Sequence, residues 1–205
     1  QKVSNHNINL SIFKKENAAT TVASTISIAS IFGIKFFATG GIGGVHLNAE
    51  NTYDVSADLY SLSEHANYVI CSGAKSILDI DKTFELLETL GITRIGYKTN
   101  YMPGFWYSET NHQVDNNFED VSDISNFLKL NSKLKHKKSV LIFNKVPEIN
   151  AISKEKINEW INSALVRAEK NKISGKALTP FLINEINTFS NNKTLKTNIS
   201  LIINN

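Results

Sequence analysis

The order of helical and strand-like segments is the feature that most restricts the fold of this 205-residue chain. Segments with helical spacing of apolar residues alternate with short apolar runs that are typical of buried strands. The expected helices cover residues 18–32, 56–65, 81–90, 121–134, 154–170 and 177–189, and the expected strands cover residues 34–39, 68–71, 93–97 and 140–144. This alternation predicts a layered α/β/α domain with a largely parallel, mixed central sheet. With no repeat period and no second core, residues 1–205 are expected to form a single domain.

Composition limits the partners and the compartment. Hydrophobic residues make up 41% of the chain and the formal net charge is +3, with the lysines dispersed along the sequence. This charge pattern gives no indication of nucleic-acid binding. The long apolar stretches contain polar residues, which argues against membrane spans. The single cysteine, Cys71, cannot form an internal disulfide, so a cytoplasmic location is expected.

Lys75 is the leading candidate for a catalytic residue. It follows the expected strand 68–71 within a run of small residues, Cys71-Ser72-Gly73-Ala74-Lys75-Ser76. Open α/β sheets bind ligands at the carboxyl ends of their strands, where this lysine is placed. A lysine becomes a nucleophile when burial lowers its pKa from about 10.4 towards neutrality. The alternative is a solvated lysine that caps a helix or contacts a phosphate.

A glycine-rich segment, Gly40-Gly41-Ile42-Gly43-Gly44, follows the expected strand 34–39. Glycines allow backbone amides to approach a bound anion closely, although a tight chain reversal explains the run equally well. The segment does not match the dinucleotide fingerprint, because His46 stands at its last glycine position. The phosphate-loop motif also fails around Lys75, because Ala74 precedes the lysine where that motif requires glycine.

Two aspartates, Asp54 and Asp58, flank Ser56 and fall on one side of an expected helix start. Such a pair often serves only as helix capping and solvated charge, and Ser56 itself is expected to cap the helix. The histidines and the cysteine show no zinc-ligand spacing. Residues 100–108 are rich in aromatic side chains and are expected to form a loop at a site wall, and the asparagine-rich residues 111–117 are expected to be a solvated loop.

Several of these segments together resemble one enzyme family. They are residues 19–25, 37–46, 54–59, 73–79, 179–182 and 195–198, in this order. The chain is similar to the pseudouridine-5'-phosphate glycosidases, also called the indigoidine synthase A-like family, over nearly its whole length. In that family roughly a hundred residues, a domain-scale length, precede the position of Gln1, and a final helix follows Asn205. The resemblance implies that residues 1–205 lack both parts, including the family's general acid/base glutamate.

The resemblance implies reversible cleavage of the C–C glycosidic bond of pseudouridine 5'-phosphate to uracil and ribose 5-phosphate. Lys75 would be the catalytic nucleophile and form an imine, a Schiff base, with the sugar. Asp54 would help to hold Mn²⁺ or another hard divalent cation, for which oxygen ligands are suited. The substrate-binding residues would be Lys2, Val22, Thr39, His46, Ser56, Ala57, Asp58 and Asn198. Of these, Lys2 would meet the sugar phosphate, and His46 and Asn198 would face the base.

The sequence departs from the family at Leu47, where arginine is usual, and at Asn5-His6-Asn7, where a basic and acidic run is usual. The family is usually trimeric, so a homotrimer is expected. Two other functions stay open. The chain could be a non-catalytic relic or structural subunit that binds a sugar phosphate without turnover. It could also be an enzyme of the same fold that acts on another base, because base specificity depends on a few pocket residues.

Overall fold

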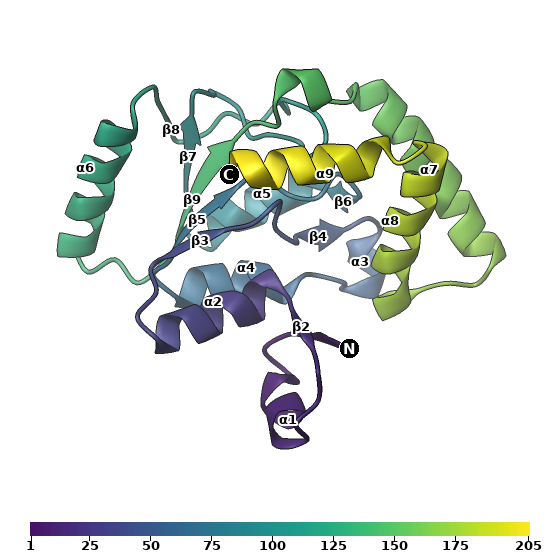
Figure 1. Cartoon of the computed structure of the whole chain (residues 1–205), viewed down its shortest axis with the longest axis horizontal. Coiled ribbons are helices and arrows are strands. Elements are labelled where there is room, and N and C mark those ends of the chain that lie inside the picture. The colour runs from purple at the N-terminus through teal and green to yellow at the C-terminus, as the bar shows by residue number, and fades with distance from the viewer.

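The computed structural model describes the backbone of residues 1–205 and every side chain except that of Lys176. Its centre is a five-stranded sheet in which all paired strands are parallel, in the order β3-β5-β9-β7-β8 (Figure 1). The strands are β3 (Phe36–Ala38), β5 (Tyr68–Cys71), β9 (Val140–Asn144), β7 (Thr93–Tyr97) and β8 (Asn116–Phe118). The predicted parallel sheet is therefore confirmed, with β3 shorter than expected. The strand β8 was not predicted, because its asparagines suggested a solvated loop.

Helices lie on both faces of the sheet, which confirms the layered α/β architecture. They are α1 (Ile8–Phe13), α2 (Val22–Ile31), α3 (Ala49–Thr52), α4 (Ala57–Glu64), α5 (Ile80–Thr89), α6 (Val121–Lys133), α7 (Lys154–Lys170), α8 (Leu178–Phe189) and α9 (Lys193–Asn204). Two small sheets accompany them, a parallel pair of β1 (Lys2–Val3) with β2 (Ala19–Thr20) and an antiparallel pair of β4 (Val45–His46) with β6 (Leu78–Asp79). The sequence did not predict α9, which carries Asn198.

The two faces of the sheet are covered unequally. Successive side chains of a strand point to opposite faces, so Val69 and Leu141 lie in a large core while Tyr68 and Ile142 lie in a small one. Helices α2, α4, α5, α7, α8 and α9 all contribute to the large core. Only α6 contributes helical residues to the small core, and Figure 1 shows this helix apart from the others. A groove of about 660 Å³ remains between α6 and the sheet.

Local capping fixes the helix starts that surround the carboxyl ends of β3 and β5. Thr21 and Ser24 form a capping box at the start of α2. The Ser56 side chain accepts a hydrogen bond from the backbone N–H of Asp58, which confirms the predicted cap of α4. Among the described residues, none of the helices combines the length and apolar character that a membrane span requires.

Candidate active site

Two loops interlock beyond the carboxyl ends of β3 and β5. We call residues 40–44 the glycine loop and residues 72–76 the lysine loop. The backbone N–H of Ser72 donates to the carbonyl of Gly40 at 3.0 Å, and that of Ile42 donates to the carbonyl of Gly73 at 3.0 Å. The Lys75 N–H returns to the Ile42 carbonyl at 3.1 Å. Main-chain hydrogen bonds therefore continue past the carboxyl ends of β3 and β5. They fix the backbone of Lys75 and so the point from which its side chain extends.

Glycine is required at two positions of these loops. Gly73 has φ +84°, and a Cβ there would lie 1.8 Å from the Pro103 carbonyl oxygen. A Cβ at Gly43 would lie 2.2 Å from the Ser56 hydroxyl oxygen. The glycine run is therefore more than a chain reversal, because Gly43 lets Ser56 approach closely, and Gly73 does the same for Pro103 at the lysine loop.

Asp58 ties the glycine loop to helix α2. Its side chain is buried, and one carboxylate oxygen accepts the Gly43 N–H at 2.7 Å while the other accepts the Ala23 N–H at 2.8 Å. The second bond places a negative charge at the start of α2, where the helix dipole stabilises it. Asp58 thus fills a structural role in the floor of the site. Its predicted contact with substrate stays a prediction.

Lys75 lies half-buried between these elements. Burial lowers the pKa of its amine, the carboxylate of Asp58 opposes this shift, and the positive charge of Lys2 adds to it. The neutral, nucleophilic amine is therefore present at lower pH than for an exposed lysine. The influence of Lys2 places a second cation, from β1, near enough to affect the Lys75 amine, and the predicted phosphate contact of Lys2 stays a prediction.

His46 and Asp54 form a second group beside Lys75. The His46 Nδ1 lies 3.9 Å from an Asp54 carboxylate oxygen. Burial lowers the pKa of His46, Asp54 opposes this, and Lys2 and Lys75 lower it further. The charges of Lys2, Asp54 and Lys75 therefore all act on the His46 ring. At neutral pH the low pKa leaves His46 a neutral ring able to donate and accept hydrogen bonds.

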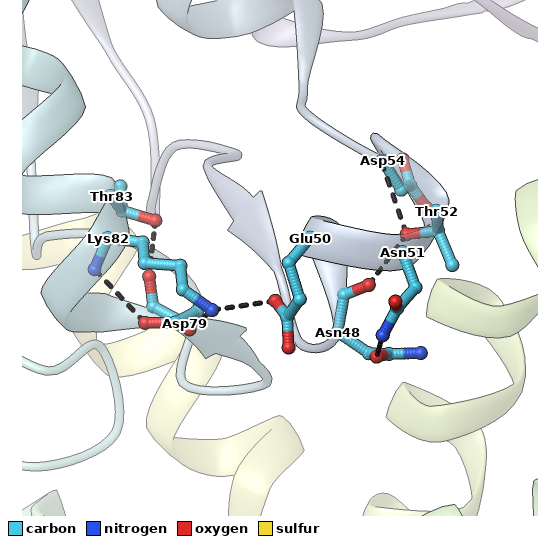
Figure 2. Close-up of polar contacts among 8 residues, drawn as sticks. All are labelled: Asn48, Glu50, Asn51, Thr52, Asp54, Asp79, Lys82 and Thr83. Carbon is cyan, nitrogen blue, oxygen red and sulfur yellow. Dashed lines mark hydrogen bonds and ion pairs between the residues drawn. The ribbon is translucent and has the colours of Figure 1, made fainter.

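The segment that carries Asp54 is anchored to helix α5 (Figure 2). Lys82 bonds to Glu50 at 2.8 Å and to Asp79 at 3.0 Å, which raises the pKa of the Lys82 amine. The Asp54 N–H donates to the Thr52 hydroxyl at 3.3 Å, so the backbone turns just before the aspartate. The Asp54 carboxylate itself is 40% exposed and so accessible to a ligand from solvent.

The described residues contain no group of three or more His, Cys, Asp or Glu side chains that could hold a metal ion. A tightly chelated zinc or calcium ion does not fit this arrangement. A single accessible carboxylate at Asp54 does fit a hard cation that keeps most of its water ligands, as Mg²⁺ usually does.

The remaining predicted residues line the same end of the sheet. Val22 is the first residue of α2, and its backbone N–H has no acceptor among the described residues. The N–H groups of the next two residues do have acceptors, which are the Asp58 carboxylate and the Thr21 hydroxyl. Thr39 extends β3 by bonding to the Ile70 carbonyl at 2.9 Å. Ser56 bonds through its N–H to the Gly44 carbonyl at 2.9 Å and leads into Ala57 at the start of α4.

Asn198 is connected to the site by a hydrogen bond to Trp106, in the aromatic loop of residues 100–108. The Trp106 indole N–H donates to the Asn198 side-chain oxygen at 2.7 Å. Phe105, the preceding residue, lies against Gly40 and Gly41, and its N–H donates to the Ser72 carbonyl at 2.9 Å. The Ser76 hydroxyl donates to the Gly104 carbonyl at 2.6 Å. Sequence reasoning placed Trp106 in a loop at a site wall, but it did not predict the bonds of Trp106 and Ser76, because their partners lie far away along the chain.

Comparisons with known proteins point to one family. The family described as "Indigoidine synthase A like protein" matches residues 1–205. The pseudouridine-5'-phosphate glycosidase of Brachyspira hyodysenteriae is 43% identical over 204 residues, and that of Geobacillus kaustophilus is 42% identical over 205 residues. All of this chain is covered in both cases, and it spans 66% of the first protein and 68% of the second.

Two crystal structures share the fold. An indigoidine synthase A-like protein from Thermotoga maritima superposes with a TM-score of 0.89 at 33% identity, covering 98% of this chain and 66% of that one. The prealnumycin C-glycosynthase AlnA, in complex with ribulose 5-phosphate, gives a TM-score of 0.91 at 32% identity, covering 98% and 67%. With the whole-length family match and the lysine and glycine loops in place, the chain belongs to the indigoidine synthase A-like family.

Proposed function

We propose that this chain carries the lysine side of an active site that reversibly cleaves the C–C glycosidic bond of pseudouridine 5'-phosphate. The observation that carries the proposal is the half-buried Lys75, whose pKa is lowered, at the carboxyl end of a parallel sheet beside Lys2 and Asp58. The names of the two glycosidase relatives and the sugar phosphate bound to the C-glycosynthase support the same substrate class.

The proposed reaction uses Lys75 as a covalent catalyst. Its neutral amine forms a bond to the anomeric carbon of the ribose as the bond from this carbon to the ring oxygen breaks, and the oxygen takes up the proton that the amine loses, which gives an open-chain amine adduct. The nitrogen lone pair then forms the C=N bond of an imine as the bond between this carbon and uracil breaks, and the electron pair of the broken bond remains on the uracil carbon, which takes up a proton. Water hydrolyses the imine to release ribose 5-phosphate and regenerate the amine. We propose that the proton donor is a residue in a segment that the glycosidase relatives have outside the part matched by residues 1–205.

The other residues take binding roles in this proposal. Lys2 and the free N–H of Val22 at the start of α2 bind the phosphate, since helix N-termini favour anions. His46 and Asn198 face the base, and the loop 56–58 and Thr39 shape the sugar site. Asp54 holds Mn²⁺ or another hard divalent cation together with water. Such a cation supplies positive charge that orients anionic groups of the substrate.

Trapping the imine tests the proposal directly. The protein, with any sequence that flanks these 205 residues, is incubated with ribose 5-phosphate and borohydride, and the modified peptide is located by mass spectrometry. We expect a reduced sugar adduct on Lys75. Lys133→Ala, an exposed position on α6, should leave the adduct intact, whereas Lys75→Ala should abolish both the adduct and uracil release. Uracil release at the parent rate by Lys75→Ala would show that another group is the nucleophile.

A second candidate is a sugar-phosphate-binding protein without turnover. It uses the same phosphate contacts, the cation of Lys2 and the N–H of Val22 at the start of α2, but needs no proton donor for uracil. Calorimetric titration with ribose 5-phosphate, combined with a uracil-release assay, separates the two. Binding with no release would support the second candidate, and release would eliminate it.

A further inference from the structure

Trp106 joins the lysine loop to helix α9. Its side chain is 1% exposed, and its indole N–H bonds to Asn198, which lies 92 positions further along the chain. On its other side, the Trp106 backbone N–H lies 3.4 Å from the Ser76 hydroxyl, and Ser76 directly follows Lys75. One buried residue therefore contacts both the segment of the proposed nucleophile and the residue proposed to face the base.

The indole has little freedom to move. The Trp106 N–H donates to the Gly104 carbonyl at 2.9 Å, and its carbonyl accepts the Ile152 N–H at 2.8 Å. Helix α9 is also fixed, because the Thr197 hydroxyl donates to the Asn150 carbonyl at 2.7 Å. The Trp106–Asn198 contact is thus held from both ends, as a positioning contact requires.

The chemistry of the indole fixes the orientation of the Asn198 amide. An indole N–H only donates, so the side-chain oxygen of Asn198, not its nitrogen, must face Trp106. The amide nitrogen then points elsewhere with its two hydrogens, and it has no acceptor among the described residues. Asn198 is half-buried, so an unused pair of donors there is available to a ligand.

We propose that Trp106 is a positioning residue that holds the Asn198 amide with its NH₂ group towards the base. The site then selects bases that present a carbonyl oxygen or a ring nitrogen acceptor at this point. This inference rests on the proposed function, in which Asn198 faces uracil. It adds the cause of the amide orientation and the hydrogen-bond character that the base must have.

The test is the synthetic direction, in which uracil and ribose 5-phosphate have separate KM values. Trp106→Phe removes the N–H and keeps an aromatic ring, and we expect it to raise the KM for uracil about 10-fold, the loss of one useful hydrogen bond. The KM for ribose 5-phosphate should change less than about 2-fold. Asn198→Ala should raise the uracil KM at least as much, and adding Trp106→Phe to it should have no further effect.

The second tryptophan provides the matched control. Trp160→Phe truncates a buried tryptophan of α7 and should leave both KM values unchanged. Asn198→Asp keeps an oxygen for the indole but removes the NH₂ group, so it should raise the uracil KM while the indole proton resonance of Trp106 stays shifted to low field.

The outcomes separate this inference from the proposed function. Equal increases of both KM values in Trp106→Phe, or an unchanged uracil KM, would overturn the positioning role while product formation still supports the glycosidase. A parent protein that forms no pseudouridine 5'-phosphate would overturn the proposed function and the base assignment together. The indole resonance in Asn198→Ala would then still report whether the contact exists in solution.

Discussion

The carboxyl end of the sheet and the sheet face under α6 are built in opposite ways. At the carboxyl end, the glycine and lysine loops are joined by main-chain hydrogen bonds and by the buried carboxylate of Asp58. Under α6, the small core contains six buried residues from the sheet and this helix, and a groove lined largely by apolar side chains remains beside it.

This difference indicates where rigidity is concentrated. A catalytic lysine and its neighbours must be held in a defined geometry, which requires dense polar contacts around them. The α6 face has no such requirement, and its loose packing costs part of the stability that the large core provides. Four experiments test the contrast, from the largest expected effect to the smallest.

Gly73→Ala should have the largest effect, because the new methyl group would meet the Pro103 carbonyl oxygen and φ is positive. We expect a loss of about 4 kcal/mol or more in the free energy of unfolding, measured by urea denaturation. Gly33→Ala is the matched control, since φ there is +68° but no atom lies within 4 Å of the new group. It should cost only about 1 kcal/mol. Equal losses would mean that backbone strain, not the close approach of Pro103, matters at Gly73.

Leucine truncation compares the two cores. Leu141 is fully buried in the large core, and Leu128 of α6 lies in the small core beside the groove. Leu141→Ala should cost about 4 kcal/mol and Leu128→Ala about 2 kcal/mol, because the groove lets the second site relax. Urea denaturation of both variants gives the two values. Similar values would show that the α6 face is as tightly packed in solution as the large core.

Asp58→Ala removes the acceptor of two buried backbone N–H groups. We expect a loss of about 3 kcal/mol in the free energy of unfolding, since both donors stay without partners. Asp54→Ala is the natural control four residues away, where the carboxylate is 40% exposed. It should cost less than about 0.5 kcal/mol while lowering the metal dependence of activity. A large stability loss at Asp54 would contradict the division between a structural and a ligand-facing aspartate.

Lys75→Met should stabilise the protein slightly while it abolishes uracil release. Because the folded-state pKa of Lys75 is lowered, the unfolded chain binds the proton more tightly, and parent stability rises with pH towards 10.5. The variant should gain about 1 kcal/mol at pH 7, and the gain should shrink as the pH approaches 10.5. Thermal unfolding at several pH values measures it, with Lys133→Met as the exposed control. A gain that does not vary with pH would point to packing rather than desolvation.

The order of elements was predictable because it depends on local patterns. The apolar runs that became β5, β7 and β9 and the amphipathic segment of α7 were all recognised at nearly the right residues. Helix α9 was missed because its sequence is rich in asparagine and β-branched residues, which have modest helix propensity. Its place depends instead on distant contacts, such as buried Leu201 in the large core.

The sequence pattern placed Lys75 at the carboxyl end of β5, as the structure has it, but did not indicate the hydrogen-bond partners of the residues around it. The sequence left open whether Lys75 is buried or solvated, and the structure decides for partial burial, which lowers the pKa of its amine. The two bonds of Asp58 were not predictable, because its partners Gly43 and Ala23 lie 15 and 35 positions away. The link from Trp106 to Asn198 depends on tertiary structure in the same way.

The interlock of the glycine and lysine loops has a consequence for how this family can change. The bonds between the two loops join main-chain atoms, which every amino acid supplies, so substitutions of side chains that make no bond to the loops leave these bonds intact. His46 and Asn198 can then be exchanged without rebuilding the loops that hold Lys75. Such a division between a main-chain platform and exchangeable side chains would let one fold serve both enzymes that break C-glycosides and enzymes that make them.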